Sequence, residues 1–227
     1  MVRIPANFFR AEIKWTFDGL AVYARIMEDQ LERLSNADRL RLKRTSFQDT
    51  AEEQLEWDKH RWIFEQVLPR ALRYSCVVSL MTAVEGSLMD ICERIHDCKK
   101  LSVAPRRHEQ REKNRRRDLS FLDIRLSYLK EIAKVRIGSH SFKNSLYALK
   151  RMRDHIVHSE GRATGGKNRE KLSRIMNSLD GFTVGHGYVE IKKGACEVIS
   201  QQAAEWINDL MDACGPPYEN PLATGRR

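Results

Sequence analysis

The segment 153–158 holds the side chains with the clearest capacity for chemistry. It reads Arg-Asp-His-Ile-Val-His, so a guanidinium, a carboxylate and two imidazoles follow one another closely. An imidazole can serve as a general acid or base near neutral pH, and a guanidinium stabilises developing negative charge. RNA cleavage needs these roles: a base for the 2′-hydroxyl proton, a donor to the leaving oxygen, and a cation for the phosphorane.

Arg153 is the unusual member of this segment. Apolar spacing over residues 142–159 predicts a helix. On a wheel of about 100° per residue its apolar side chains share one arc: Phe142, Leu146, Leu149, Ile156 and Val157. Arg153 falls near the middle of that arc, where it must be paired, reach solvent or serve an interface, because burying an unpaired guanidinium costs several kcal/mol. A structural ion pair with a carboxylate such as Glu85 is the alternative to a functional role.

His158 follows Arg153 by five residues, so on a regular helix the two side chains point about 140° apart. They can cooperate if the helix is distorted near its end, or if a two-fold axis brings this helix against its copy in a second protomer. Asp154 lies four residues before His158, and we expect it to hydrogen-bond and orient the imidazole. His155 projects elsewhere, and we expect it at the surface or the rim of the site.

A dense basic cluster between residues 99 and 117 carries most of the net charge of +9. Nine Lys and Arg residues face two Glu residues there. Such a cluster attracts phosphate backbones through counterion release without sequence specificity, and a solvated, partly disordered basic loop is the alternative. The candidate RNA-binding residues are Lys99, Lys100, Arg106, Arg107, Arg115, Arg116 and Arg117.

Periodicity along the rest of the chain predicts an all-α fold with one sizeable core. The expected helices cover 8–34, a stretch beginning at a Thr50/Glu53 capping box, 72–95, 121–134 capped by Ser120, 142–159 and 197–213. The polar stretch 35–47 separates the first two, and Pro69 either opens a new helix or kinks a continuous one. Alternating residues on both sides of Gly185-His186-Gly187 predict a small β-hairpin before the last helix.

Composition argues against metal, membrane and secretion. The five cysteines are scattered without a Cys-x-x-Cys pair, which is typical of reduced thiols in the cytoplasm. Cys92, His96 and Cys98 lie close together, but no fourth ligand is evident, so we expect no metal site. No apolar run approaches the roughly 20 residues that span a bilayer, and the N-terminus does not resemble a signal peptide, so we expect a cytoplasmic protein.

The segment 153–161 resembles the R-x4-H signature of HEPN domains (higher eukaryotes and prokaryotes nucleotide-binding). Three surrounding features are similar to the bacterial, defence-type layout of that family. They are the upstream Leu-Ser-Tyr-Leu-Lys at 126–130, the Ala-Val-Glu-Gly-Ser-Leu at 83–88 within a long helix, and the hairpin followed by a helix. The resemblance covers roughly residues 69–213, with the N-terminal helices as a looser match.

This resemblance implies an up-and-down helical bundle that dimerises across the motif helices. It also implies a metal-independent endoribonuclease at the shared cleft, without cofactors, acting as a toxin or antiphage defence effector with an antitoxin or sensor protein as a further partner. Arg153 and His158 match the family's catalytic pair, and Asp154 occupies a position commonly filled by Asn. Its negative charge weakens RNA binding unless it is used to orient His158. Glu85 and His155 would support the site.

Two alternatives remain open at this point. One is a non-catalytic HEPN module that binds RNA, a nucleotide or a partner protein. The other is a helical protein that binds nucleic acid through its basic cluster, in which the R-x4-H match occurs by chance. The expected organisation is N-terminal helices (1–68) packed on the core, a HEPN-like domain (69–214) with the basic insertion 99–117, and a flexible tail (215–227).

Overall fold

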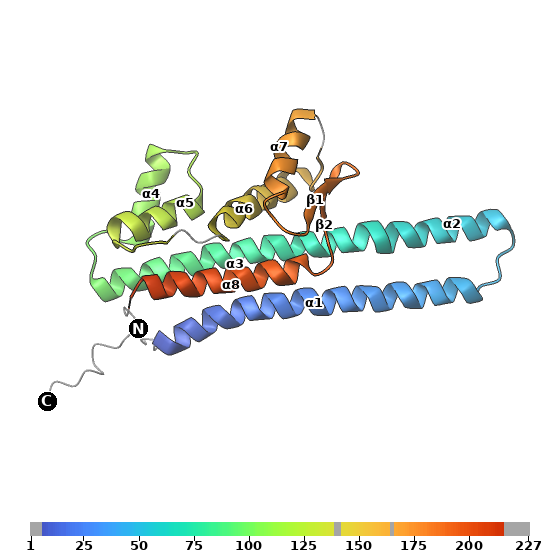
Figure 1. Cartoon of the computed structure of the whole chain (residues 1–227), viewed down its shortest axis with the longest axis horizontal. Helices are drawn as coiled ribbons and strands as arrows, with labels where there is room; N and C mark the ends of the chain where they lie inside the picture. Colours follow the sequence, from blue (N-terminus) through green and yellow to red (C-terminus); the bar gives the residue numbers. More distant parts are fainter. Residues whose placement is uncertain (1–5, 139–141, 164–165, 216–227) are drawn as a thin grey trace. The chain divides into compact units, whose positions relative to one another are not determined.

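The computed structural model describes residues 6–138, 142–163 and 166–215, and these form an all-α protein (Figure 1). The helices are α1 (Ala6–Arg44), α2 (Thr50–Arg61), η1 (Trp62–Val67), α3 (Leu68–Lys99), α4 (Pro105–Arg115), α5 (Phe121–Ser127), η2 (Tyr128–Ile132), α6 (Phe142–Ser159), α7 (Gly166–Met176) and α8 (Ala195–Ala213). Strands β1 (Phe182–Gly185) and β2 (Tyr188–Ile191) pair antiparallel before α8. The predicted fold class, all-α with a hairpin before the last helix, is confirmed.

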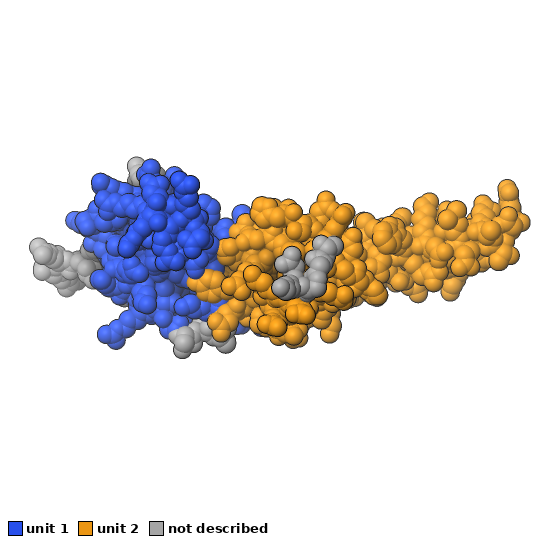
Figure 2. Space-filling model, turned by 90° about the horizontal axis from the view of Figure 1, so that it is seen from above, with its two compact units in different colours: residues 1–18, 80–143, 201–227 blue, residues 19–79, 144–200 orange. Residues whose placement is uncertain are grey.

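The chain divides into two compact units, which Figure 2 colours separately. Unit 1 comprises Met1–Asp18, Leu80–Lys143 and Gln201–Arg227, and unit 2 comprises Gly19–Ser79 and Asn144–Ser200. The segment 153–158 therefore belongs to unit 2, whereas the basic cluster belongs to unit 1. The boundary predicted after residue 68 lies inside unit 2, and the predicted flexible tail lies outside the described residues except for Gly215.

Helix α1 is longer than its sequence pattern predicts. The polar stretch 35–47 was expected to separate two helices, yet the helix continues to Arg44. No Gly or Pro interrupts residues 20–44, and Leu42 is buried while its polar neighbours are largely solvated. Asp38 contacts the buried His60 of α2, with Oδ2 and Nδ1 2.8 Å apart. Hydrogen bonding from His60 and then from Arg41 lowers the pKa of Asp38 below its ordinary value.

The N-terminal cap of α2 differs from the prediction by one residue. Asp49, rather than Thr50, is the N-cap, and its side chain accepts a hydrogen bond from the Glu52 backbone N–H at 2.7 Å. The Glu52 carboxylate in turn accepts from the Gln48 backbone N–H at 2.8 Å. The predicted Thr50/Glu53 capping box is therefore wrong, because an Asp carboxylate one position earlier satisfies the same orphan donors.

Pro69 lies within a continuous helical segment rather than at a boundary. The six-residue π-helical turn η1 comes immediately before α3, and the Leu68 N–H donates to the Ile63 carbonyl. Proline cannot donate the bond that a regular helix would require, and π-helical pairing just upstream accommodates the break in the ladder. Of the two outcomes expected for Pro69, a new helix or a kinked continuous one, the structure shows a continuous helical segment, with a π-helical turn directly before α3.

One 18-residue window within Thr50–Lys99 is long and apolar enough to span a bilayer, with a mean hydropathy of 1.4. Half of that window is buried inside the protein. The core helix of a soluble protein has the same properties, so the cytoplasmic localisation stays a prediction.

The basic cluster lies largely in a helix rather than in a loop. Helix α4 begins with Pro105 after the N-cap Ala104, a position where proline's missing N–H has no cost. His108 anchors the helix, because its buried ring nitrogen Nε2 lies 2.9 Å from the Ser127 hydroxyl. The alternative of a solvated, partly disordered loop is therefore wrong for residues 105–115.

Gly161 allows the end of α6 to approach α3 and the hairpin within unit 2. Its φ is 72°, its carbonyl accepts from the Val189 N–H at 2.9 Å, and the Tyr74 hydroxyl donates to the Val189 carbonyl at 2.7 Å. Burial raises the pKa of Tyr74 to about 12, so its hydroxyl stays a donor. A Cβ at position 161 would overlap the Tyr74 ring and hydroxyl.

We expect Gly161→Ala to lower the free energy of unfolding by more than about 2 kcal/mol, because a left-handed L-residue costs roughly 1–2 kcal/mol and Tyr74 must also move. Denaturant unfolding followed by circular dichroism measures this loss. Gly187→Ala is the matched control, since Gly187 has a φ of 79° and a Cβ added there would meet nothing within 4 Å. Equal losses in both variants would contradict a role for Tyr74.

Candidate active site on helix α6

Helix α6 is regular through the whole segment that carries the candidate catalytic residues. It runs without interruption from Phe142 to Ser159. Regular geometry keeps the side chains of Arg153 and His158 about 140° apart. Of the two routes by which they could cooperate, a distortion near the helix end does not occur, and the two-fold route remains.

The buried face of α6 is displaced from the arc predicted for it. Its buried residues are Phe142, Leu146, Ala148, Leu149, Met152 and Ile156. Val157, which was expected to face the core, is 54% exposed. Arg153 consequently lies at the edge of the buried face rather than near its middle, and its side chain is 26% exposed. The burial cost expected for Arg153 is therefore smaller than the sequence pattern predicts.

Asp154 is engaged by its basic neighbours. Its Oδ2 lies 2.5 Å from the Nζ of Lys150, one helical turn earlier, and its Oδ1 lies 3.2 Å from the Nε of Arg153. Within the described parts of the chain, no hydrogen bond or ion pair joins Asp154 to His158. The expectation that Asp154 orients His158 is therefore wrong for this structure, because Lys150 competes for the carboxylate and holds it.

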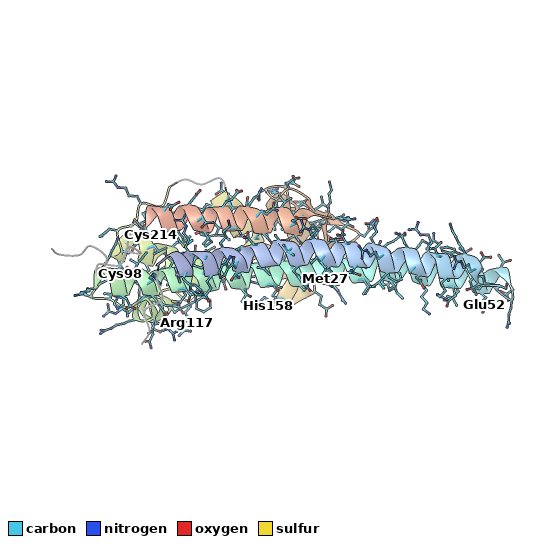
Figure 3. The ribbon with its side chains drawn as sticks, turned by 90° about the horizontal axis from the view of Figure 1, so that it is seen from below. Met27, Glu52, Cys98, Arg117, His158 and Cys214 are labelled. Carbon is cyan, nitrogen blue, oxygen red and sulfur yellow. The ribbon has the colours of Figure 1, made fainter. Side chains whose placement is uncertain are left out.

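The two histidines of the segment have different environments. His158 is exposed at the surface of unit 2 (Figure 3). His155, expected at the surface or rim, is half-buried, and its Nε2 is buried without a hydrogen-bond partner among the described residues. Glu85 is partly buried in unit 1, where its carbonyl accepts from Arg125. Its pairing with Arg153 stays a prediction.

The seven candidate RNA-binding residues of unit 1 are all exposed. Three of them have partners in that unit: Lys99 donates to the Ala133 carbonyl at 3.3 Å, Arg106 to Glu93 at 3.0 Å, and Arg116 lies 3.8 Å from Asp118. The side chains of the other four form no hydrogen bond or ion pair with a described residue: Lys100, Arg107, Arg115 and Arg117 (Arg117 is labelled in Figure 3). Unit 1 thus presents cations that are available to an anionic partner.

The cysteine and histidine residues considered for metal binding do not form a common site. Cys92 is buried, its Sγ contacts the Arg125 carbonyl at 3.7 Å, and burial raises the pKa of its thiol; Cys98 is exposed. Over residues 6–138, 142–163 and 166–215, no group of three or more His, Cys, Asp or Glu side chains is placed to hold a metal ion.

Unit 2 also contains a pocket that the sequence pattern did not predict. Its volume is about 480 Å³, and it is lined by residues of α6, of α7 and of the turn after α7: Asn144, Tyr147, Ala148, Arg151, Glu170, Lys171, Arg174, Ile175 and Ser178. Helix α7 was missed because the nearby glycines signalled only the end of α6. The helical spacing of Leu172, Met176 and Leu179, all buried, could have revealed it.

Comparisons with models of protein families, with curated protein sequences and with solved structures gave no significant match. The resemblance to HEPN domains therefore depends on the motif residues and on the order of the elements around them.

Proposed function

We propose that the protein is a metal-independent endoribonuclease that acts as a homodimer, in which the α6 helices of two copies face each other. The observation that carries the proposal is the exposure of the α6 surface between Arg153 and His158. Val157 lies between these residues on the helix and is 54% exposed. An apolar side chain flanked by an arginine and a histidine suits a surface that a second copy covers.

In this dimer each protomer contributes one arginine and one histidine to a shared groove. The groove holds two equivalent composite sites, each formed by the His158 of one protomer and the Arg153 of the other. At each site His158 accepts the proton of the 2′-hydroxyl as its oxygen attacks phosphorus, and it then donates that proton to the 5′-oxygen as the P–O5′ bond breaks. Arg153 stabilises the negative charge of the phosphorane. The products are a 2′,3′-cyclic phosphate and a 5′-hydroxyl, and the step requires no metal ion.

The ion pairs of Asp154 remove one objection to this mechanism. A carboxylate beside the groove would repel a phosphate, but Lys150 lies 2.5 Å from it and Arg153 lies 3.2 Å from it. The three charges together leave a positive surplus on this part of α6. Such a ribonuclease would suit a toxin or antiphage defence effector whose activity an antitoxin or sensor protein restrains.

The test is incubation of the purified protein with single-stranded RNA in EDTA. We expect cleavage that leaves cyclic-phosphate ends, and a loss of at least about 10²-fold in both Arg153→Ala and His158→Ala. His186→Ala is the matched control, because His186 is exposed in the hairpin turn and should be dispensable. Circular dichroism checks folding. Absence of cleavage by folded, dimeric wild type, or full activity of His158→Ala, would refute the proposal.

One observation favours a second candidate, a non-catalytic module that binds RNA. Arg153 is paired with Asp154, as in a structural role, and the exposed cations of unit 1 provide a surface for phosphates without any acid–base chemistry. This candidate predicts binding that weakens steeply with salt, is unchanged by Arg153→Ala, and produces no cleavage.

A further inference from the structure

The pocket of unit 2 uses one continuous face of α6. Asn144, Tyr147, Ala148 and Arg151 follow the spacing i, i+3, i+4 and i+7 that places side chains on one side of a helix. Ala148 is small, which leaves room between its larger neighbours. The face therefore presents an amide, an aromatic ring and a guanidinium in a row.

The charge of the pocket is predominantly positive. Arg151 of α6 and Lys171 and Arg174 of α7 line it, against a single carboxylate, Glu170. The three cations are exposed, and none of their side chains forms a hydrogen bond or ion pair with another residue that the structure describes. The single carboxylate Glu170 offsets the mutual repulsion of these three cations only in part, and an anion of matching size would relieve the rest.

The same face of α6 leads from the pocket to His158. Arg151 and His158 are seven residues apart, which on a regular helix separates their directions by only about 20° and their positions by about 10.5 Å along the axis. Arg153, by contrast, points about 160° away from Arg151. A chain molecule held in the pocket can thus extend along α6 to the imidazole without crossing the helix.

We propose that the pocket binds the single-stranded RNA substrate on one side of the cleaved bond. This proposal rests on the ribonuclease function proposed above. Arg151, Lys171 and Arg174 contact the phosphate backbone, and a base stacks on Tyr147. Backbone contacts from cations combined with stacking on an aromatic ring are the usual means of holding a single strand without sequence preference. A volume of about 480 Å³ accommodates a nucleotide-sized group.

The test is the affinity of full-length His158→Ala protein, which binds without cutting, for a fluorescein-labelled single-stranded RNA, measured by fluorescence anisotropy over a range of salt concentrations. We expect the triple variant Arg151→Ala/Lys171→Ala/Arg174→Ala to bind at least about tenfold more weakly. The slope of the logarithm of the binding constant against the logarithm of the salt concentration should become shallower by about two to three. Tyr147→Leu should weaken binding about fivefold or more without changing that slope.

A matched control removes the same number of exposed cations from another part of unit 2. Arg39→Ala/Lys43→Ala/Arg44→Ala does so at the end of α1 and should bind nearly as well as the parent protein. Equal weakening in both triple variants, or none in the pocket variant, would overturn the proposal. The proposal would also be overturned if the pocket variants lost binding of adenosine monophosphate or inorganic phosphate while their RNA binding was unchanged. The pocket would then bind a free phosphate ligand.

The outcome is separable from that of the ribonuclease assay. If wild type never cleaves RNA but the pocket triple variant still loses RNA affinity, the proposed catalysis fails and the pocket remains an RNA-binding site. If wild type cleaves, and the pocket substitutions change neither the affinity of the His158→Ala protein nor the cleavage rate when they are introduced into wild type, the pocket proposal alone fails.

Discussion

Mixing Arg153→Ala protein with His158→Ala protein is expected to restore about a quarter of the wild-type ribonuclease activity, although each variant alone is inactive. Random pairing makes about half of the dimers mixed. In each mixed dimer, one of the two composite sites keeps both its arginine and its histidine, whereas the other site lacks both. The measurement is the cleavage rate after subunit exchange, or after coexpression with two affinity tags that isolate the mixed dimer.

The geometry of α6 is the reason for this expectation. The helix is regular to Ser159, so Arg153 and His158 of one chain point about 140° apart and cannot contact the same phosphate from one protomer. A site made within one protomer would show no recovery on mixing, because every chain would lack one essential group. Failure of the isolated mixed dimer to cleave RNA would therefore disprove the shared site.

A substitution between the two residues gives an independent control. Val157→Asp should break the dimer and the activity together, because it places a charge in the proposed interface. Val198→Asp is the matched change, since Val198 is also exposed, at 47%, but lies on α8. Sedimentation velocity shows whether Val157→Asp becomes a monomer while Val198→Asp stays a dimer. A dimer that survives Val157→Asp would place the interface elsewhere.

Local rules account for the elements that were predicted well. The ends of α6, the hairpin about Gly187 and the Ser120 cap of α5 depend on residues within a few positions of one another. Ser120 and Asp123 do form the reciprocal capping box. Such features are predictable because their partners lie close together in the sequence.

The missed features depend on what packs against each element. The polar residues of 35–44 have no strong preference against a helix, and the burial of Leu42 together with the contact between Asp38 and the buried His60 favours the continuation of α1 to Arg44. Helix α7 is short and follows glycines that also fit a loop. Neither outcome can be derived from a window of the sequence, because the stabilising contacts come from distant segments.

The candidate site shows the same division. The angle between Arg153 and His158 follows from the helical period. Which side of α6 is buried does not follow from that period, and Val157, expected to face the core, is exposed. Asp154 has two neighbours at helical spacing, Lys150 before it and His158 after it. A lysine is fully charged at neutral pH, whereas an imidazole is in general only partly protonated, so the carboxylate gains more from Lys150.

The ion pair between Glu28 and Arg73 is expected to be the most sensitive polar contact of unit 2. The Arg73 Nε and Nη2 lie 2.6 and 2.8 Å from the Glu28 carboxylate oxygens, and Nη1 donates to the Ile191 carbonyl at 2.7 Å. One guanidinium thus joins α1, α3 and β2, and Glu28 is only 6% exposed. We expect Glu28→Ala or Arg73→Ala to lower the free energy of unfolding by roughly 3–5 kcal/mol, because each leaves a buried charge without its partner.

Removing both charges together should cost far less than removing either one. Glu28→Leu/Arg73→Met fills the same space with apolar groups and leaves only the Ile191 carbonyl without its donor, which costs roughly 1–3 kcal/mol. This cost is offset because the two charged groups no longer have to be desolvated on folding. Denaturant unfolding of Glu28→Leu, of Arg73→Met and of the double variant forms a mutant cycle that measures the coupling. Glu32→Ala is the control, because Glu32 and its partner Lys193 are solvated and should matter little. If the double variant is as unstable as the sum of the singles, the two charges are uncoupled, and the fold of unit 2 does not depend on their pairing.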